Sequence, residues 1–212
     1  MKRRIISSIA IFGFIITSSA QNKGKIEIGF NAGLNSSNAT TTYYSAERSI
    51  SLNLGASADY YLSDSWSLKL KLIYDRKGWD NDFIQVSGFD PIEFPAYERT
   101  NVNLNYITVP LMANWHFGSK KNWYLNFGPY IGFLMNAKET RLDTDIKKEF
   151  NTVDGGLSLG IGVKIPVSDK LKLFIEYEVQ GGMAEIYKNN EEGDKNMNIR
   201  SSFNFGINFL LD

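Results

Sequence analysis

The chain has 212 residues, with 23 basic and 23 acidic side chains and therefore a formal net charge of zero at pH 7. It contains no cysteine and one histidine, which excludes disulfide scaffolds, thiol nucleophiles, cysteine-ligated zinc sites and histidine-pair metal motifs. The balanced charge, without a strongly basic block, argues against a nucleic-acid binder.

The first twenty residues have the layout of a secretory signal peptide. Lys2, Arg3 and Arg4 are followed by a mostly apolar run at 5–16 and then by small residues up to Ala20, as signal peptidase substrates require. The apolar run is shorter than the ~20 residues of a membrane-spanning helix. We therefore predict a signal peptide at 1–20 and one mature domain at 21–212. Its 20 basic and 23 acidic residues give a net charge of −3.

The rest of the chain alternates between apolar and polar residues with period two, which is typical of strands with two different faces. In one run, for example, Leu68 and Leu70 alternate with Lys69 and Lys71. No segment has 18 continuous apolar residues, so no transmembrane helix is predicted. Most of the alternating runs reach the ~9–11 residues of a tilted membrane strand. Eight strands are predicted, at 26–34, 50–62, 66–74, 107–117, 123–133, 153–165, 171–179 and 199–211.

Short and long connections alternate between these strands. The short turns are 63–65, 118–122 and 168–170, whereas the long connections are about 35–49, 79–101, 137–151 and 183–197. Transmembrane barrels of the outer membrane have short periplasmic turns and long extracellular loops. The fold class predicted here is therefore all-β, an eight-stranded antiparallel up-and-down transmembrane barrel of the OmpA/OmpX type in a Gram-negative outer membrane.

The alternative, a soluble barrel with its apolar face inside, is disfavoured because eight faces of large side chains would overfill so narrow an interior. The tryptophans support the membrane barrel. Trp66, Trp115 and Trp123 lie beside short turns, and Trp79 follows the other end of its strand. We predict that these four form the aromatic girdles that flank the apolar belt of such barrels.

The polar face carries charges of both signs, which persist in an interior only when they are paired or hydrated. An eight-stranded barrel has room for side chains but not for an aqueous channel. We predict a salt-bridge network that fills the lumen, with an open conduit as the alternative. Its predicted members are Glu27, Asp59, Lys69, Lys71, Lys172, Glu176, Glu178 and Arg200, together with Asp75, Asp154 and Lys164.

The 23-residue connection 79–101 is the longest and is rich in aromatic residues. Long loops with their own apolar side chains are often binding surfaces. We predict that this loop faces a partner or ligand through Phe83, Phe89, Phe94 and Tyr97.

Catalytic, cofactor and metal sites are not predicted. A lipid-active enzyme would need His116 as a base, but this residue lies beside a short turn and no partnered nucleophile is apparent. Asp143 and Asp145, and the acidic segment 191–194, lack the spacing of a calcium loop.

Three short segments resemble the outer-membrane β-barrel domain family common in Bacteroidetes, which includes the PorT-like proteins. They are Tyr106–Leu111, Gly128–Gly132 and Asn204–Phe209, and the signal peptide that ends at Ala20 fits the same lineage. The resemblance implies the barrel fold and an accessory role in secretion or envelope assembly. The family has no known catalytic residues to transfer.

We therefore expect a monomeric, non-enzymatic barrel with a structural or interaction role. It would contact outer-membrane lipid and could bind a protein partner through its long extracellular loops. The alternatives are a narrow pore or small-molecule transport barrel and, less favoured, a lipid-active enzyme.

Overall fold

The computed structural model describes residues 23–40, 47–87, 94–190 and 195–211. The predicted signal peptide, Phe89 of the predicted partner loop and the acidic segment 191–194 lie outside the described residues.

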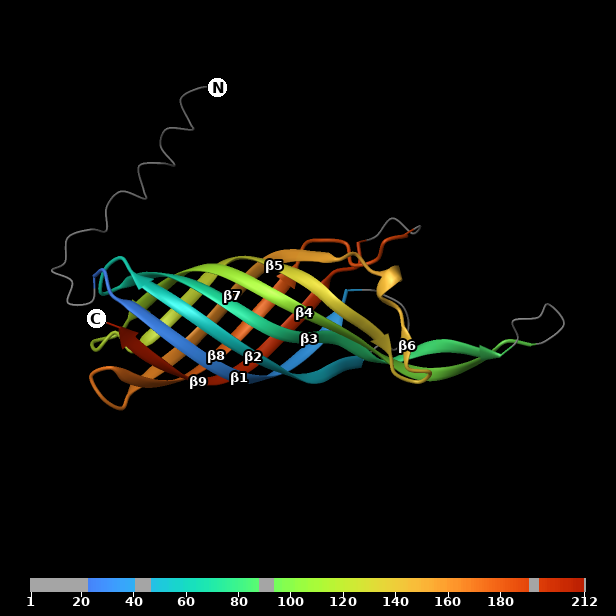
Figure 1. Ribbon diagram of the computed structural model, residues 1–212, viewed down its shortest axis with the longest axis horizontal. Coiled ribbons are helices and arrows are strands. Elements are labelled where there is room, and N and C mark those ends of the chain that lie inside the picture. The colour runs from blue at the N-terminus through green and yellow to red at the C-terminus, as the bar shows by residue number, and fades with distance from the viewer. Residues whose placement is uncertain (1–22, 41–46, 88–93, 191–194, 212) are drawn as a thin grey trace, which may run out of the picture.

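Eight antiparallel strands form one closed barrel (Figure 1). Each strand pairs with its neighbours in the chain, β4 pairs with β5, and the first and last strands pair with one another. This confirms the predicted eight-stranded up-and-down barrel. The wall consists of β1 (Ile26–Ala39), β2 (Glu47–Tyr61), β3 (Trp66–Ser87), β4 (Ala96–Phe117), β5 (Trp123–Glu139), β7 (Val153–Pro166), β8 (Leu171–Gly182) and β9 (Asn198–Leu211).

Two small elements lie between β5 and β7. Strand β6 (Thr144–Asp145) pairs with the end of β5, and the short 3-10 helix η2 (Lys147–Glu149) follows it. Within the described residues, no helix has the length and apolar character needed to cross a membrane.

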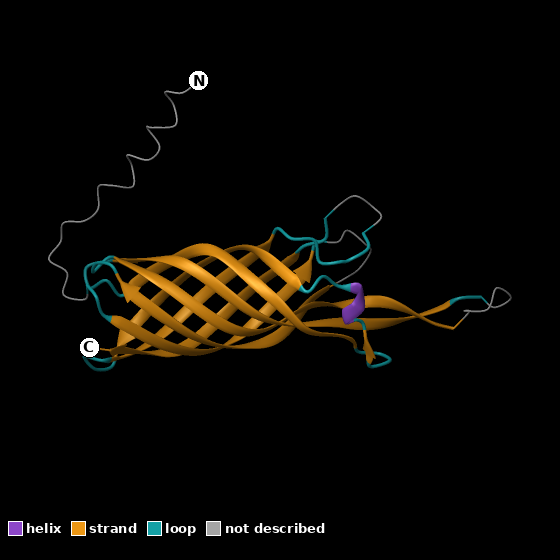
Figure 2. Cartoon of the chain, turned by 45° about the horizontal axis from the view of Figure 1, so that its top comes forward, coloured by secondary structure: helices purple, strands orange, loops and turns teal. Residues whose placement is uncertain are grey.

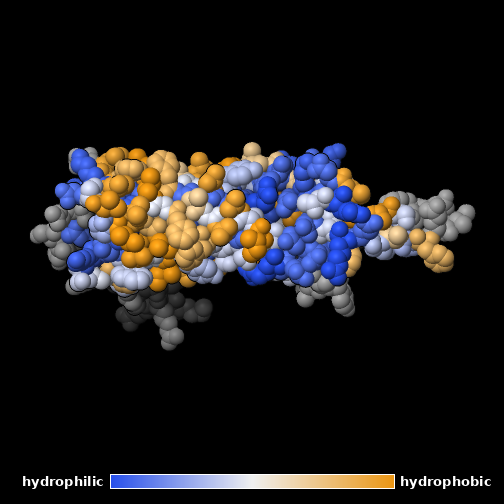
Figure 3. All heavy atoms as spheres, turned by 90° about the horizontal axis from the view of Figure 1, so that it is seen from below, coloured by the Kyte–Doolittle hydropathy of each residue, from blue (hydrophilic) through white to orange (hydrophobic). Residues whose placement is uncertain are grey.

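The period-two pattern separates the two faces of the wall. Leu52, Phe30 and Leu70 point outward, where about half or more of each side chain is exposed, whereas Lys69 and Asn53 point inward and are buried. On the face drawn in Figure 3, apolar residues form a band around the barrel between two more polar ends. The alternation in the sequence thus becomes an apolar exterior and a polar lumen.

The two ends of the barrel differ as predicted. Tight turns at 62–65, 118–122 and 167–170 connect the strands at one end, with backbone hydrogen bonds such as Leu62 N to Trp66 O (2.9 Å) and Val167 N to Leu171 O (2.9 Å). The described parts of the longer connections lie at the other end (Figure 2).

The prediction that 79–101 forms a loop is wrong, because most of this segment is β-strand. Both strands continue past the barrel rim, so β3 and β4 extend as a two-stranded ribbon, and residues 88–93 between them lie outside the described residues. We call 82–87 and 94–101 the β3–β4 ribbon, which includes Phe94 and Pro95 just before β4. Positive φ angles at Gly78 (134°) and Asn81 (58°) accompany a register shift where β3 leaves the wall, since irregularities of this kind favour glycine and asparagine.

A bulge near the long-loop end of β5 changes which residues face inward. Tyr106 of β4 pairs with Leu134, but Asn105 pairs with Asn136, so Met135 is the extra residue. After the bulge, Ala137 points inward and is fully buried while Met135 is exposed. An extra residue shifts the side-chain alternation by one, which turns Ala137 toward the lumen at this end.

Candidate functional site

The lumen is filled by charged and polar side chains in three layers. The layer nearest the short turns is centred on Glu27 of β1, whose carboxylate pairs with Lys164 and Lys172 (2.7 Å to Lys172 Nζ). Tyr61 and Asn208 donate further hydrogen bonds to it. The Glu27 carboxylate on β1 therefore contacts side chains from four other strands, β2, β7, β8 and β9.

Asp59 of β2 is the second carboxylate of this layer. Its oxygens accept from Lys69 Nζ (3.3 Å) and from Ser67 Oγ and Asn114 Nδ2 (3.0 and 3.1 Å). The Lys69 ammonium also lies 4.9 Å from the centroid of the Tyr124 ring, a distance that suits a cation–π contact.

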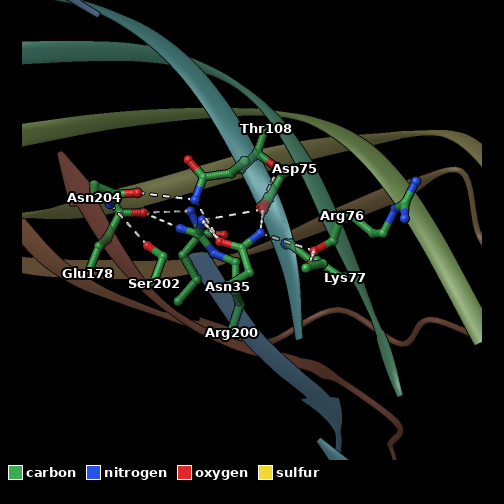
Figure 4. A network of polar contacts seen from close by, with 12 residues as sticks. Asn35, Asp75, Arg76, Lys77, Thr108, Glu178, Arg200, Ser202 and Asn204 are labelled. Carbon is green, nitrogen blue, oxygen red and sulfur yellow. Dashed lines mark hydrogen bonds and ion pairs between the residues drawn. The ribbon is translucent and has the colours of Figure 1, made fainter. Parts of the chain in front are cut away.

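The middle layer contains a chain of ion pairs. Lys71 bridges Glu176 and Glu178 of β8, and Arg200 of β9 binds Glu178 and Asp75. Figure 4 shows this network from close by, with Arg200 between the carboxylates of Glu178 and Asp75. Asn35 adds a hydrogen bond to Asp75 (2.7 Å).

Asparagines complete the middle layer. Asn53 donates to Asn35 (2.7 Å) and to Asn204 (3.1 Å), and Asn204 donates to Ser202. These side chains come from β1, β2 and β9, which are consecutive strands of the wall, so the hydrogen bonds tie together the inner faces of three neighbouring strands.

The third layer is built on Lys77 and Asp154, whose charged atoms are 2.9 Å apart. The Lys77 ammonium lies 5.0 Å and 4.7 Å from the ring centroids of Tyr106 and Tyr130, and the Tyr130 hydroxyl contacts Asp154. Asn198 also donates to Asp154 (3.1 Å).

The structure places all eleven residues of the predicted charge network in the lumen, each in at least one ion pair. Sequence reasoning missed Lys77 and the inward tyrosines. Lys77 continues the alternation of Lys69, Lys71 and Asp75, but the predicted strand ended at 74. Extending the period-two pattern by three residues would have found it.

Above the third layer, an apolar cluster closes the long-loop end of the lumen. We call it the apolar plug. Its buried members are Ala39, Trp79, Val102, Leu104, Tyr106, Leu134, Ala137, Phe150 and Ile186, with Ile146 and Tyr187 packed against them. The Trp79 ring packs near Phe150 (6.2 Å) and Tyr187 (6.3 Å).

The prediction that Trp79 belongs to an aromatic girdle is therefore wrong. Only 3% of its side chain is exposed, because residue 79 has the same parity as the lumen residues 69, 71 and 77. Trp66, Trp115 and Trp123 do lie on the outer surface near the short turns, and Trp66 stacks on Trp115 with ring centroids 6.2 Å apart.

The connection after β8 folds over the plug through Glu185. Its carboxylate accepts hydrogen bonds from the N–H groups of Tyr187 (2.9 Å) and Asn196 (3.0 Å) and from the side chain of Asn190 (2.7 Å). Burial raises the pKa of this carboxyl, but these donors outweigh it and hold the pKa below its ordinary value.

His116 contacts a serine inside the barrel. Ser67 Oγ lies 2.9 Å from His116 Nε2 and donates its own proton to Asp59. In a serine hydrolase the carboxylate orients the imidazole and the serine is open to substrate. Here the carboxylate holds the serine instead, and all three side chains are buried.

The acidic pair considered as a calcium loop has local partners. Asp143 forms an exposed ion pair with Lys138 (2.7 Å), and Asp145 accepts from the backbone N–H of Lys147. Among the described residues, no group of three or more histidine, aspartate or glutamate side chains is placed to hold a metal ion.

The β3–β4 ribbon presents three of the four predicted partner residues. Phe83, Phe94 and Tyr97 have exposed fractions of 49%, 96% and 59%. From Asp82 onward, β3 pairs only with β4 among the described residues, because the pairing of β2 ends at Asp80. The ribbon therefore has little covering it beyond the rim.

Residues 19–182 match the model of a family described as the outer membrane protein beta-barrel domain. No curated protein matches the chain in sequence. Among solved structures, the chain is similar to OprG from Pseudomonas aeruginosa, with 13% identity, a TM-score of 0.53 and coverage of 91% of this chain and 98% of OprG. It is similar to Neisserial surface protein A with 17% identity, a TM-score of 0.51 and coverage of 87% and 96%. At these identities the likeness shows the fold alone.

Proposed function

Because this chain belongs to the outer membrane protein beta-barrel domain family and resides in the outer membrane, we propose that it is a non-enzymatic, monomeric barrel that presents the β3–β4 ribbon to a protein partner outside the cell. The observation that carries the proposal is the ribbon itself. It extends both strands beyond the wall and exposes Phe83, Phe94 and Tyr97 to solvent.

The chemistry of the ribbon suits a protein partner. Exposed aromatic side chains are the residues most enriched at protein interfaces. A strand pair that lacks further neighbours offers backbone groups to which another strand can add. The acidic and basic side chains of Glu98 and Arg141, which form an ion pair at the ribbon's edge, would favour a partner with polar groups around its apolar contacts.

A conduit is the second candidate, and the lumen argues against it. Ion pairs join non-neighbouring strands across the lumen at three levels, namely Lys164 with Glu27, Lys71 with Glu176, and Lys77 with Asp154, and the apolar plug lies above them. Eight strands leave no aqueous channel once side chains occupy the interior. A lipid-active enzyme is disfavoured by the buried arrangement of Ser67, His116 and Asp59.

Two finer parts of the proposal depend on the sequence. The strand motifs, such as Tyr106–Leu111, favour kinship with the PorT-like proteins of Bacteroidetes and with it an accessory role in secretion or envelope assembly. Export through a signal peptide at 1–20 completes this proposal, and N-terminal sequencing of the mature protein tests it.

A photo-crosslinking amino acid placed in intact cells tests the ribbon directly. We expect protein adducts from positions 83 and 97 on the ribbon, and none from position 74, whose tyrosine lies on the outer wall. Deleting 82–98 should remove the partner and retain the shift in gel mobility between unboiled and boiled samples that a folded barrel gives.

Single-channel recording of the refolded protein and an acyl-hydrolase assay address the alternatives. We expect no stable conductance and no hydrolysis. Steady ion conductance by the wild-type barrel, or equal protein adducts from positions 74 and 83, would contradict the proposed role.

A further inference from the structure

The short-turn end of the lumen opens into a pocket of about 340 Å³ that the proposed surface role does not use. A volume of this size lies within the range of small-molecule sites. Because outer-membrane barrels have their short turns in the periplasm, the pocket opens toward the periplasm and lies near the inner-leaflet side of the wall.

Positive charge dominates the lining. Five lysines contribute to it, namely Lys25 before β1, Lys120 and Lys121 in the β4–β5 turn, Lys164 on β7 and Lys172 on β8. The acidic residues of the lining are Asp64 and Asp169, so the pocket has an excess of cationic groups.

The lysines differ in what they already bind. Lys164 and Lys172 share the Glu27 carboxylate at the floor. Lys25, Lys120 and Lys121 form no ion pair with a described residue. Three ammonium groups around the mouth are therefore available to an anion.

A second observation comes from the pocket lining. His116 lines the pocket, is 1% exposed, and has a buried Nδ1 atom without a hydrogen-bond partner in the described part of the chain. Its Nε2 atom is engaged by Ser67. A buried polar atom without a partner costs free energy, and a ligand with a hydroxyl or an acidic oxygen would remove that cost.

We propose that this pocket binds a phosphate-bearing anion at the periplasmic mouth of the barrel. Lysine ammonium groups act as compact point charges and are common phosphate ligands. The three around the mouth form no ion pair with a described residue, and three separate cations suit a group with several anionic oxygens better than a single carboxylate. The phosphate can belong to a phospholipid headgroup of the inner leaflet or to a soluble phosphate ester of the periplasm.

The direct test is titration of the purified mature barrel with inorganic pyrophosphate, in dodecyl maltoside and a buffer free of phosphate. The chain has one histidine, so a ¹⁵N-histidine label with a histidine-free affinity tag gives one ring to observe. We expect saturable binding by calorimetry and a shift of the His116 Nδ1 resonance over the same concentration range.

A matched pair of variants locates the site. Lys120→Gln with Lys121→Asn removes two charges from the mouth, and asparagine tolerates the positive φ of 54° at position 121. Lys148→Gln with Lys188→Gln removes two charges from the long-loop end. We expect at least about tenfold weaker pyrophosphate binding in the first variant and less than twofold change in the second. The mobility shift on boiling verifies folding in both.

Lipid nanodiscs distinguish the two sources of phosphate. If phosphatidylglycerol nanodiscs suppress pyrophosphate binding relative to phosphatidylcholine nanodiscs, a lipid headgroup occupies the pocket. If binding is the same in both, the ligand is soluble. Absence of saturable pyrophosphate binding, an unchanged His116 resonance, equal loss in the two double variants, or binding of an acidic peptide in place of pyrophosphate would each overturn the proposal.

Discussion

The two ends of the lumen are built from the same alternating strands and have opposite chemistry. At the long-loop end, Trp79, Phe150 and Ile186 pack into the apolar plug. At the short-turn end, lysines surround an open pocket. The ion pairs of Lys71 and Arg200 lie between them. The interior is therefore a cavity that is open at one end and closed at the other, rather than a continuous channel. The closed end is stabilised by apolar burial and dispersion, whereas the middle is stabilised by ion pairs.

The largest expected effect comes from breaking the middle of the lumen. Arg200→Met leaves the buried carboxylates of Asp75 and Glu178 with fewer cationic partners. Removing one partner of a buried ion pair costs about 3–5 kcal/mol. We expect the folded gel band of unboiled samples to disappear at a clearly lower temperature.

Arg200→Lys is the control, because it retains the charge and should lose much less stability. If Arg200→Met and wild type lost the folded band at the same temperature, the middle layer would not stabilise the barrel, and the contrast between a charged middle and an apolar end would fail.

A smaller, local effect is expected at the closed end. Phe150→Ala removes a buried ring from the plug, at a cost of about 3 kcal/mol in a core. Because Phe150 lies in a connection, we expect local opening instead of unfolding, with amide exchange at Ile186 and Tyr187 faster by about a hundredfold.

Leu142→Ala, in the same connection but exposed, should leave this exchange unchanged. Conductance should stay at baseline in Phe150→Ala, since the ion pairs beneath the plug remain. A conducting Phe150→Ala variant would mean that the plug alone seals the lumen.

Acid should loosen the closed end before it affects the barrel. The pKa of the Glu185 carboxyl is held below its ordinary value of 4.5 in the folded loop. Its stabilising effect is therefore complete above that value and is lost as the pH falls through the depressed pKa. We expect the amide NMR signals of Tyr187 and Asn196 to shift in this acidic range.

Glu185→Gln should abolish that pH dependence and leave the loop in its loosened state at neutral pH. The same pH-dependent shifts in the Glu185→Gln variant would assign the transition to another group.

The smallest effect is expected outside the lumen. Lys138 and Asp143 are an ion pair with side chains 47% and 79% exposed, and such pairs contribute at most about 1 kcal/mol. Lys138→Gln should leave the unfolding temperature nearly unchanged. A loss comparable to that of Arg200→Met would remove the distinction between lumen and surface pairs.

Much of the barrel was predictable because period two reports which face each residue occupies. The eight strands, the short turns and the inward positions of Glu27, Asp59 and Arg200 follow from parity alone. Parity does not predict which residues form ion pairs across the lumen. Lys71, for example, binds two carboxylates on β8 that lie more than a hundred residues further along the chain. Such contacts depend on the register of the strands and on how the barrel closes, and neither can be read from the residues next to Lys71 in the sequence.

The errors have equally physical causes. The position of Trp79 after the predicted end of its strand favours a girdle residue. Its odd number, however, places it on the same face as the buried residues Lys69, Lys71 and Lys77. The ribbon was predicted as a loop because it lies beyond the belt where lipid enforces alternation. Ala137 joins the plug because of the bulge at Met135, which reverses parity without an obvious mark in the sequence.

The seam between β1 and β9 has a consequence for the order of assembly. These strands pair along their whole length, from Ile26 with Leu211 to Ala39 with Asn198, so the last strand of the chain closes on the first. Contacts between such distant segments make folding slow. Until β9 is in place, β1 has an edge of unpaired backbone groups, which leaves the unfinished barrel open to pairing with another chain.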